Sequence, residues 1–270
     1  MRTLHTMKLS AIHNLRIQKA GLEKKEGLIL PRSIMRASDL QEYEQIIVTK
    51  INGKSFDNRI RTIVLTDDCD MVTVCGSLAR FLSAGDLTCV ISETVITEEN
   101  QNSFVQDKWP IFDVGFNPET NTDNSEWIRE LQYCNKKNVA DKSYNIENAL
   151  ASRRELLRVK MASLVVGMEI NKTHPDCLHG SAEIPASVLK AAEISQYRSV
   201  SVYNSTIGGV AETYAVAMPE GTVMTTGAMA SFAKLGDVVN VATFDITNCL
   251  IKPVICYTDG MSVKEVAHEL

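Results

Sequence analysis

Residues 74–87 read Val74-Cys75-Gly76-Ser77-Leu78-Ala79-Arg80-Phe81-Leu82-Ser83-Ala84-Gly85-Asp86-Leu87, and residues 225–238 repeat this pattern without a gap. The second stretch is Thr225-Thr226-Gly227-Ala228-Met229-Ala230-Ser231-Phe232-Ala233-Lys234-Leu235-Gly236-Asp237-Val238. Glycine, alanine, phenylalanine, glycine and aspartate coincide at a constant separation of 151 residues (227 − 76), and the apolar positions stay apolar. Self-similarity at a fixed offset is the signature of a repeated structural unit, so it predicts two copies of one domain.

A second block extends the repeat toward the N-terminus. Leu30-Pro31-Arg32-Ser33-Ile34-Met35-Arg36-Ala37 lies opposite Ile184-Pro185-Ala186-Ser187-Val188-Leu189-Lys190-Ala191, at a separation of 154 residues (185 − 31). The two offsets differ by three residues, which a loop of unequal length in the two copies explains. In each block the proline stands at the first position of a short helix, where its missing N–H costs nothing.

Both copies then follow the same order of predicted elements. An alternating strand (45–49 and 199–203) leads to a glycine-containing turn and a further alternating strand. The repeated stretch supplies a second short helix, after which a Gly-Asp pair turns the chain into a last strand (87–91 and 238–242). Many short strands with two small helices per copy predict a mainly β protein made of two compact β-barrels.

The segment between the copies is polar and contains Asn117-Pro118-Glu119-Thr120-Asn121-Thr122-Asp123-Asn124, which is the composition of a linker. Helical spacing of apolar residues predicts helices over 125–137 and 145–159. We therefore expect a first barrel over residues 1–96, a partly helical linker over 97–158, and a second barrel over 159–270.

Composition excludes several classes of partner. The chain has 270 residues, a net charge of −5 and no basic stripe, so nucleic acid is not expected as a partner. No apolar run is long enough for a membrane span or a signal peptide. The seven cysteines are odd in number and form no CxxC pair, and the histidines lack metal-ligand spacing. These features predict a reduced, cytoplasmic protein without a metal site.

Four motifs of the second copy occur in a familiar order. Gly180-Ser181 lies just before the helix-starting Pro185, and Thr213-Tyr214, Thr226-Gly227-Ala228 and Gly236-Asp237 follow it. Together with the tail Lys252-Pro253-Val254-Ile255-Cys256-Tyr257-Thr258-Asp259-Gly260, this order resembles the pyruvoyl-dependent aspartate 1-decarboxylases. The resemblance implies a double-psi β-barrel for each copy. It also implies a homo-oligomer, in which a dimer of the fused chain forms a pseudo-tetramer of four barrels.

The resemblance further implies a self-processing site. The Ser181 hydroxyl would attack the carbonyl of Gly180, and elimination and hydrolysis would leave a pyruvoyl group at the new N-terminus. Its ketone serves as the electron sink in decarboxylation of an amino acid. In this family the threonine matched by Thr213 assists cleavage and the tyrosine matched by Tyr214 supplies a proton. The residues matched by Thr226, Gly227 and Ala228 bind the substrate, which is a small molecule.

The sequence departs from the family at several of these positions. The first copy has Glu26-Gly27-Leu28 in place of Gly-Ser and cannot form a pyruvoyl group there. The family's strand lysine and histidine fall on Ala11 and His13 in the first copy, and on the region of Val166 and Met168 in the second. Its carboxylate-binding arginine falls on Val210 and Ser55. A lost arginine removes a bidentate carboxylate clamp, so the expected substrate is a small amino acid or a derivative rather than aspartate.

Residues from another barrel offer a replacement for the lost charge. In the family the pocket lies between neighbouring subunits, so a fused pair of copies would combine Ser181 from one copy with His13, Lys8 and Arg59 from the other. The repeat alignment places Arg59 opposite Tyr214. This arrangement predicts a site that one barrel alone cannot complete.

Two other classes of function stay open at this point. Cys75 falls on the family's pocket asparagine and His13 on its pocket histidine, so the two predict a nucleophile–base pair for acyl transfer or cyclisation of an amino-acid-derived intermediate. Asp57 or Asp86 would orient the histidine. Alternatively the barrels form a non-catalytic binding module, in which neither Ser181 nor Cys75 reacts.

Overall fold

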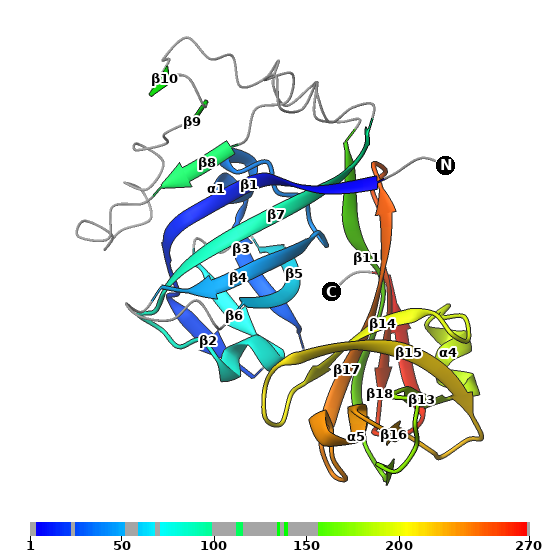
Figure 1. The fold of residues 1–270 in the computed structure, drawn as a ribbon. Coiled ribbons are helices and arrows are strands. Elements are labelled where there is room, and N and C mark those ends of the chain that lie inside the picture. The colour runs from blue at the N-terminus through cyan, green and yellow to red at the C-terminus, as the bar shows by residue number, and fades with distance from the viewer. Residues whose placement is uncertain are drawn as a thin grey trace.

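The computed structural model describes residues 4–22, 25–51, 59–67, 71–98 and 156–268, and the backbone of 112–115, 134–135 and 138–139. Strands dominate these residues and form two barrels side by side, the first drawn from blue to green and the second from green to red (Figure 1). In the ranges just named, no helix is both long and apolar enough to cross a membrane.

Among the described residues, the second barrel repeats the elements of the first in the same order, with an α-helix in place of a 3₁₀-helix, and ends on one further strand. The first barrel consists of β1 (Leu4–Arg16), β2 (Lys19–Gly21), β3 (Gly27–Pro31), α1 (Arg32–Ala37), β4 (Gln45–Lys50), β5 (Arg59–Asp67), β6 (Thr73–Cys75), the 3₁₀-helix η1 (Gly76–Arg80), β7 (Leu87–Thr97) and β8 (Phe112–Gly115). The second consists of β11 (Leu157–Glu169), β12 (Lys172–His174), β13 (Ala182–Pro185), α4 (Ala186–Ala191), β14 (Ser199–Asn204), β15 (Val210–Met218), β16 (Met224–Thr226), α5 (Met229–Phe232), β17 (Val238–Thr247), β18 (Val254–Thr258) and β19 (Val263–Ala267).

The strands pair in the same order in both barrels. β1, β7, β4 and β5 pair antiparallel in that order, β5 pairs parallel with β3, β3 antiparallel with β6, and β6 parallel with β2. Because β2 follows β1 after two residues, the series returns to its starting strand. In the second barrel, β11, β17, β14, β15, β13, β16 and β12 repeat this series. The duplicated, mainly β fold predicted from the repeat is therefore confirmed.

The pairing registers fix which residues of the two barrels are counterparts. Leu28 pairs with Val64 in the first barrel, and Ala182 pairs with Ala215 in the second. The offset between the copies is therefore 154 residues at Leu28 (182 − 28) and 151 residues at Val64 (215 − 64). It changes between β4 and β5, where the first copy has the longer loop. Arg59 is thus the counterpart of Val210, and the predicted match of Arg59 with Tyr214 was wrong.

Two further counterparts follow from these registers and correct the predicted alignment. Ile63 takes the place of Tyr214 in the first barrel. On the first strand, Val166 is the counterpart of His13 and Leu164 that of Ala11, where the sequence had suggested Met168 and Val166. The bulges in β1 and β11 made this strand hard to align by sequence.

The region between the barrels contains more strand than its composition predicts. β8 lies within the expected linker and runs parallel to β1, as β18 runs parallel to β11. Cys134–Asn135 (β9) pairs with Asn138–Val139 (β10), and Leu157 opens β11 by pairing with Val95. The C-terminal ends of both predicted helices were therefore wrong, because sheet pairing overrides helical spacing there. Most of the expected linker lies outside the described residues.

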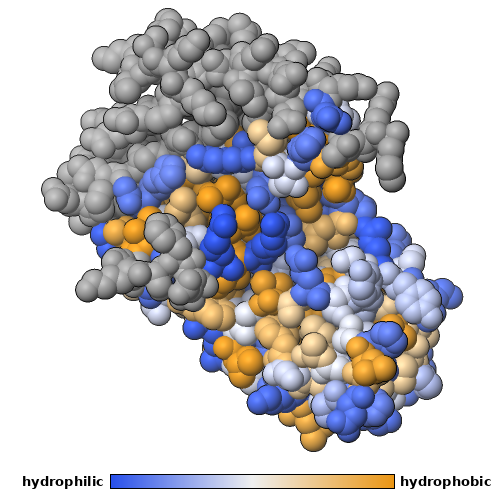
Figure 2. Space-filling view, in the orientation of Figure 1, coloured by the Kyte–Doolittle hydropathy of each residue, from blue (hydrophilic) through white to orange (hydrophobic). Residues whose placement is uncertain are grey.

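A shared hydrophobic cluster joins the barrels, each of which also has its own core. The first barrel contributes Ile29, Tyr43, Ile63, Leu65 and Cys75, and the second contributes Met161, Leu164, Val166, Tyr203, Ala242 and Ile255. These two sets occupy different positions of the repeat, so the barrels contact each other through unlike faces. In Figure 2, hydrophobic side chains are exposed on the front of both barrels, among hydrophilic ones.

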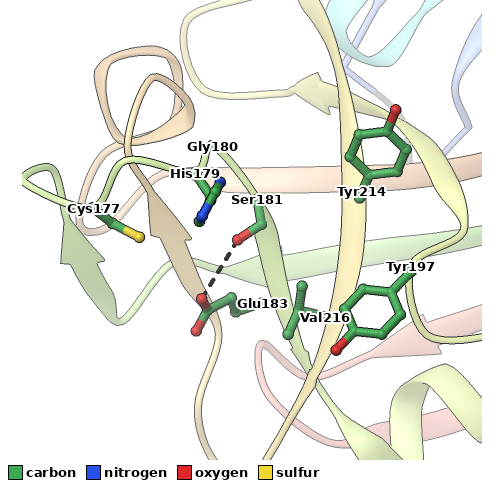
Figure 3. A pocket seen from close by; sticks show the side chains of 8 residues that line it. All are labelled: Cys177, His179, Gly180, Ser181, Glu183, Tyr197, Tyr214 and Val216. Atoms are coloured by element: carbon green, nitrogen blue, oxygen red, sulfur yellow. Dashed lines mark hydrogen bonds between the residues drawn. The ribbon is translucent and has the colours of Figure 1, made fainter.

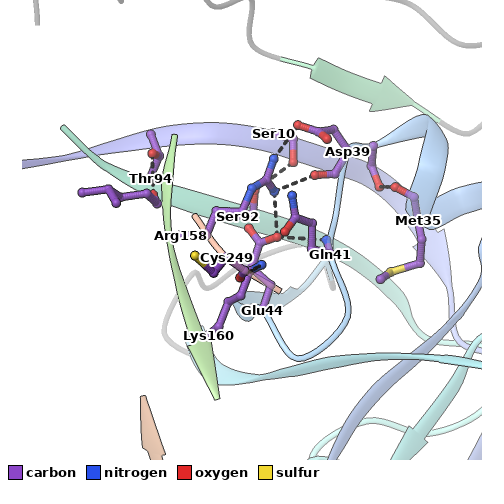
Figure 4. Close-up of polar contacts among 12 residues, drawn as sticks. Ser10, Met35, Asp39, Gln41, Glu44, Ser92, Thr94, Arg158, Lys160 and Cys249 are labelled. Atoms are coloured by element: carbon purple, nitrogen blue, oxygen red, sulfur yellow. Dashed lines mark hydrogen bonds and ion pairs between the residues drawn. The ribbon is translucent and has the colours of Figure 1, made fainter. Parts of the chain in front are cut away.

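A buried ion pair lies at the same boundary (Figure 4). Arg158 of β11 is 1% exposed and donates from Nη1 to Glu44 Oε2 at 2.8 Å and from Nη2 to Asp39 Oδ2 at 2.6 Å. Burial raises the pKa of Glu44, and the guanidinium of Arg158 opposes this shift. The backbone continues the contact, because Met161 N donates to Tyr43 O at 2.8 Å. Arg158 therefore neutralises two carboxylates of the first barrel that face the second.

We expect Arg158→Ala to lower the free energy of unfolding by about 3–5 kcal/mol, because it leaves the buried carboxylate of Glu44 without its counter-charge. Arg198→Ala is the matched control, since the ion pair of Arg198 with Asp245 is about half exposed and should contribute about 1 kcal/mol or less. Urea unfolding of both variants checks this, and equal losses would contradict the structural role given to Arg158.

Candidate active site

A pocket of about 520 Å³ opens on the second barrel (Figure 3). Its lining consists of Cys177, His179, Gly180, Ser181, Glu183, Tyr197, Tyr214 and Val216. The parallel pairing of β13 with β15 places Ser181 beside the Thr213-Tyr214 pair, because Ala182 is in register with Ala215. In Figure 3 the Ser181 hydroxyl points toward Glu183, and the two tyrosines stand across the pocket from Cys177 and His179. The pocket is thus built around the Gly180-Ser181 bond.

Thr226 at the end of β16 holds Ser181 in place. The Thr226 hydroxyl donates its proton to His179 O at 2.8 Å, so its oxygen accepts from Ser181 N at 3.0 Å and from Ser181 Oγ at 2.7 Å. Since the serine proton points to Thr226, the lone pairs of Ser181 Oγ are left available for attack. Glu183 Oε1 lies 3.4 Å from the same hydroxyl and offers a second acceptor.

The carbonyl before Ser181 also has a specific partner. Thr213 Oγ1 donates to Gly180 O at 2.6 Å. A hydroxyl donor at a carbonyl oxygen stabilises the negative charge that develops there when a nucleophile adds to the carbon. The peptide bond between Gly180 and Ser181 therefore has a hydroxyl donor on its carbonyl and a buried hydroxyl on its next residue.

The turn after Thr226 requires glycine. Gly227 has a φ of +50°, and a Cβ there would lie 2.7 Å from the carbonyl oxygens of both Cys177 and His179. Gly180 is different, because a Cβ on it would meet the backbone nitrogens of Ala228 and Met229 at 3.5 Å, an ordinary contact. Gly227 thus brings these backbone N–H groups close to the candidate scissile bond.

The first barrel fills the equivalent place with its own side chain. Glu26 and Gly27 are the counterparts of Gly180 and Ser181. Glu26 Oε1 accepts from Ser77 Oγ at 2.6 Å, while Oε2 accepts from Ser77 N at 3.1 Å and from Asn240 Nδ2 of the second barrel at 3.0 Å. Burial raises the pKa of Glu26, against the lowering effect of these hydrogen bonds. A carboxylate therefore occupies the first barrel's version of the site.

The remaining predicted residues lie on the first barrel, and the pocket lining just given includes none of them. Lys8 and His13 are half-buried on β1, and Arg59 is exposed at the start of β5. Cys75 is fully buried in the cluster between the barrels, which argues against its predicted role as a nucleophile. The thiol that does lie beside His13 is that of Cys89, with Sγ 3.6 Å from Nδ1. Asp86 pairs with Lys50, and Asp57 lies outside the described residues.

Sequence reasoning missed Glu183, Tyr197, Cys177 and Cys89. Glu183 follows Ser181 by two residues on a strand, so strand alternation places both side chains on one face. Cys89 was read only as a strand residue, because its proximity to His13 depends on the pairing of β1 with β7. Within the part of the chain that the structure describes, no group of three or more histidine, cysteine, aspartate or glutamate residues could hold a metal ion.

Comparison with known proteins agrees with this geometry. The sequence matches the aspartate decarboxylase family twice, over residues 3–109 and 154–260, which together make up more than half of the chain. The chain belongs to the aspartate decarboxylase family.

The individual relatives have low sequence identity to this chain. The aspartate 1-decarboxylase of Acetivibrio thermocellus is 28% identical over 102 residues, which cover 37% of this chain and 78% of that protein. The aspartate 1-decarboxylase of Syntrophomonas wolfei is 29% identical over 99 residues, which cover 36% of this chain and 80% of that protein. Each relative has about the length of one barrel, which agrees with a duplicated chain.

We expect Glu26→Gln to change how stability depends on pH. Because the folded state raises the pKa of Glu26, it binds this proton more tightly than the unfolded state, so folding loses stability as the pH rises above the ordinary value of 4.5. The free energy of unfolding of the wild type should therefore fall relative to that of Glu26→Gln from acidic to neutral pH. Parallel pH profiles of the two proteins in urea unfolding would contradict this.

Proposed function

We propose that this chain cleaves itself between Gly180 and Ser181 and then acts as a pyruvoyl-dependent decarboxylase of a small amino acid. The observation that carries the proposal is the pair of hydroxyl contacts at this bond: Thr213 Oγ1 on the Gly180 carbonyl and Thr226 Oγ1 on the Ser181 hydroxyl. Membership of the aspartate decarboxylase family supports the class of reaction.

Cleavage uses the chain's own groups. Ser181 Oγ adds to the Gly180 carbonyl carbon as its proton passes to the carboxylate of Glu183. The C–N bond then breaks as the nitrogen takes up this proton, leaving an ester. Loss of the proton on the Ser181 Cα then expels the Gly180 carboxylate and leaves dehydroalanine. Hydrolysis of dehydroalanine releases ammonia and leaves the ketone. Thr213 stabilises the charge on the Gly180 oxygen during the first step.

The residues around Ser181 fit a pyruvoyl group. When formed, this group supplies an electron sink for the loss of CO₂ from an amino acid bound to it. Tyr214 lines the same pocket, and its hydroxyl is a proton donor for the product carbon. Glu183 provides a carboxylate that accepts a proton or orients the substrate amine.

The first barrel indicates how a substrate carboxylate binds. There the carboxylate of Glu26 accepts a hydrogen bond from Ser77 N. Ala228 is the counterpart of Ser77, and its nitrogen lies 3.5 Å from a Cβ placed on Gly180. We therefore assign the backbone nitrogen of Ala228 to the carboxylate of the substrate, while the nitrogens of Thr226 and Gly227 donate to Ser181 O and His174 O.

We expect denaturing mass spectrometry of the purified protein to give two fragments, residues 1–180 and 181–270, because both hydroxyl contacts favour the cleavage. Ser181→Ala should give a single species of 29.9 kDa, since it removes the nucleophile. Thr213→Val should slow cleavage roughly 100- to 1,000-fold, which is the loss expected for one donor to a developing oxyanion.

The control for Thr213→Val is Thr62→Val, because Thr62 is the buried counterpart of Thr213 in the first barrel. This variant should cleave at the wild-type rate. A wild-type chain that stays at its full mass would refute self-processing.

The face that carries the pocket is exposed on the second barrel, whereas the equivalent face of the first barrel is buried by the second. Four of its lining residues, Glu183, Tyr197, Tyr214 and Val216, are the counterparts of Ile29, Tyr43, Ile63 and Leu65, which the second barrel covers. Tyr43 is 8% exposed but Tyr197 is 70% exposed, and Ile63 is 0% exposed but Tyr214 is 59% exposed. The same face is therefore buried on the first barrel and bare on the second.

The first barrel carries the face that fits this bare surface. Lys8, His13 and Arg59 are the counterparts of Met161, Val166 and Val210, which pack on the first barrel in the shared cluster. Because the barrels meet through unlike faces, a second chain can repeat the contact, and two chains close a ring of four barrels. We propose that the working protein is this homodimer.

The dimer would bring positive charge to the pocket of the partner chain. Arg59 stands at the strand position of Val210, which the family resemblance gives to the carboxylate-binding arginine. Lys8, His13 and Arg59 of one chain thus face Glu183 and the substrate site of the other, where they supply the counter-charge that the second barrel lacks.

We expect light scattering to give a mass of twice 29.9 kDa for the wild type, because the bare face is apolar and has a complementary face on the first barrel. Tyr197→Glu should give monomers, since it buries a charge in the contact. Leu235→Glu is the matched control: Leu235 is 67% exposed, but its counterpart Ala84 is exposed too and lies outside the contact between barrels. Monomeric wild type at micromolar concentration would contradict the dimer.

A further inference from the structure

We infer that Cys89 of one chain lies against the substrate in the pocket of its partner, held there by His13. The inference rests on the proposed dimer and names a pocket residue on its basis. It starts from the one place where the contact between unlike faces can be seen directly, the boundary between the two barrels of a single chain.

At that boundary, one polar residue of the second barrel reaches into the site of the first. Asn240 of β17 donates from Nδ2 to Glu26 Oε2 at 3.0 Å, and Glu26 is the counterpart of Gly180. The pairing of Tyr203 with Asn240 and of Thr49 with Cys89 makes Cys89 the counterpart of Asn240. In a repeated contact, Cys89 therefore points at Gly180 and Ser181 of the partner.

The group opposite Cys89 would differ from the one opposite Asn240. Glu26 brings its own carboxylate to Asn240, whereas Gly180 has no side chain and leaves that volume to a ligand. The ligand group expected there is a carboxylate, because Ser77 N and Asn240 Nδ2 both donate to one in the first barrel. Cys89 would donate its S–H to the substrate carboxylate where Asn240 donates an N–H.

His13 sets the position of this thiol. Its Nδ1 lies 3.6 Å from Cys89 Sγ, and both side chains are half-buried on the outer face of the first barrel. Val166, the counterpart of His13, is buried in the shared cluster, so the imidazole would lie in the contact as well. The His13–Cys89 pair therefore stands in the repeated contact where the second barrel has Val166 and Asn240.

Chemical cross-linking tests the position of Cys89. Gly180→Cys places a thiol where the side chain of Glu26 begins in the first barrel, and the neighbouring atoms leave room for its Cβ. Treatment with dibromobimane, which joins two nearby thiols and then fluoresces, should yield a fluorescent band of two chains. Peptide mapping should find residue 180 linked to Cys89. The matched control is Gly180→Cys combined with Cys89→Ser, which should give no linked dimer.

Light scattering of Gly180→Cys before dibromobimane is added tests the dimer separately from the position of Cys89. A monomer would show that the proposed dimer fails. A dimer that forms no link to Cys89 would overturn the inference and leave the dimer intact.

Kinetics of the self-processed enzyme give a second readout. Cys89→Ala should raise KM by up to about tenfold with kcat unchanged, as expected for one lost hydrogen bond to the substrate. Cys89→Asn should restore KM, because it reproduces the donor that Asn240 provides to Glu26. Equal KM values for Cys89→Ala and the wild type would overturn the contact with the substrate.

Discussion

The contact between the two barrels determines what each barrel can do. It joins unlike faces, through a shared hydrophobic cluster and the buried pairing of Arg158 with Glu44 and Asp39. Within one chain this contact joins the site face of the first barrel to the face of the second barrel that carries Met161, Leu164 and Val166. Because the site face is used up on the first barrel, the free site is the one on the second barrel, around Ser181.

The two sites have diverged in a way that fits this geometry. In the first barrel Glu26 fills the site, and its carboxylate is held by Ser77 and by Asn240 of the other barrel. The site of the first barrel is therefore part of the interface between the barrels, where Glu26 accepts a hydrogen bond from Asn240. In the second barrel Gly180 leaves the same volume open, while Thr213 and Thr226 contact the adjacent carbonyl and hydroxyl. The two copies of the repeat thus differ in what occupies the same volume, a carboxylate in the first barrel and open space in the second.

The repeat and the order of strands and helices in the two barrels could be predicted from the sequence, and Gly180 and Ser181, which the sequence singled out, line a pocket. Glycine, proline and alternating strand residues act locally, so they mark the same turns and strands in both copies. The counterpart of Tyr214 could not be predicted, because the longer loop of the first copy shifts the register by three residues between β4 and β5. Cys89 beside His13 was missed for a related reason, since their distance depends on strand pairing across the barrel. Cys75 was misread because a pocket position in one barrel becomes an interior position once another barrel covers it.

The central claim is that one of two equivalent sites works, and counting reactive ketones tests it directly. Titration of the purified protein with a hydrazine, followed by mass spectrometry of the labelled chains, measures how many carbonyl groups each chain carries and where. The account predicts one label per chain, on the first residue of the 181–270 fragment, and no label on residues 1–180. A chain without any label, or a label on the first barrel, would contradict it.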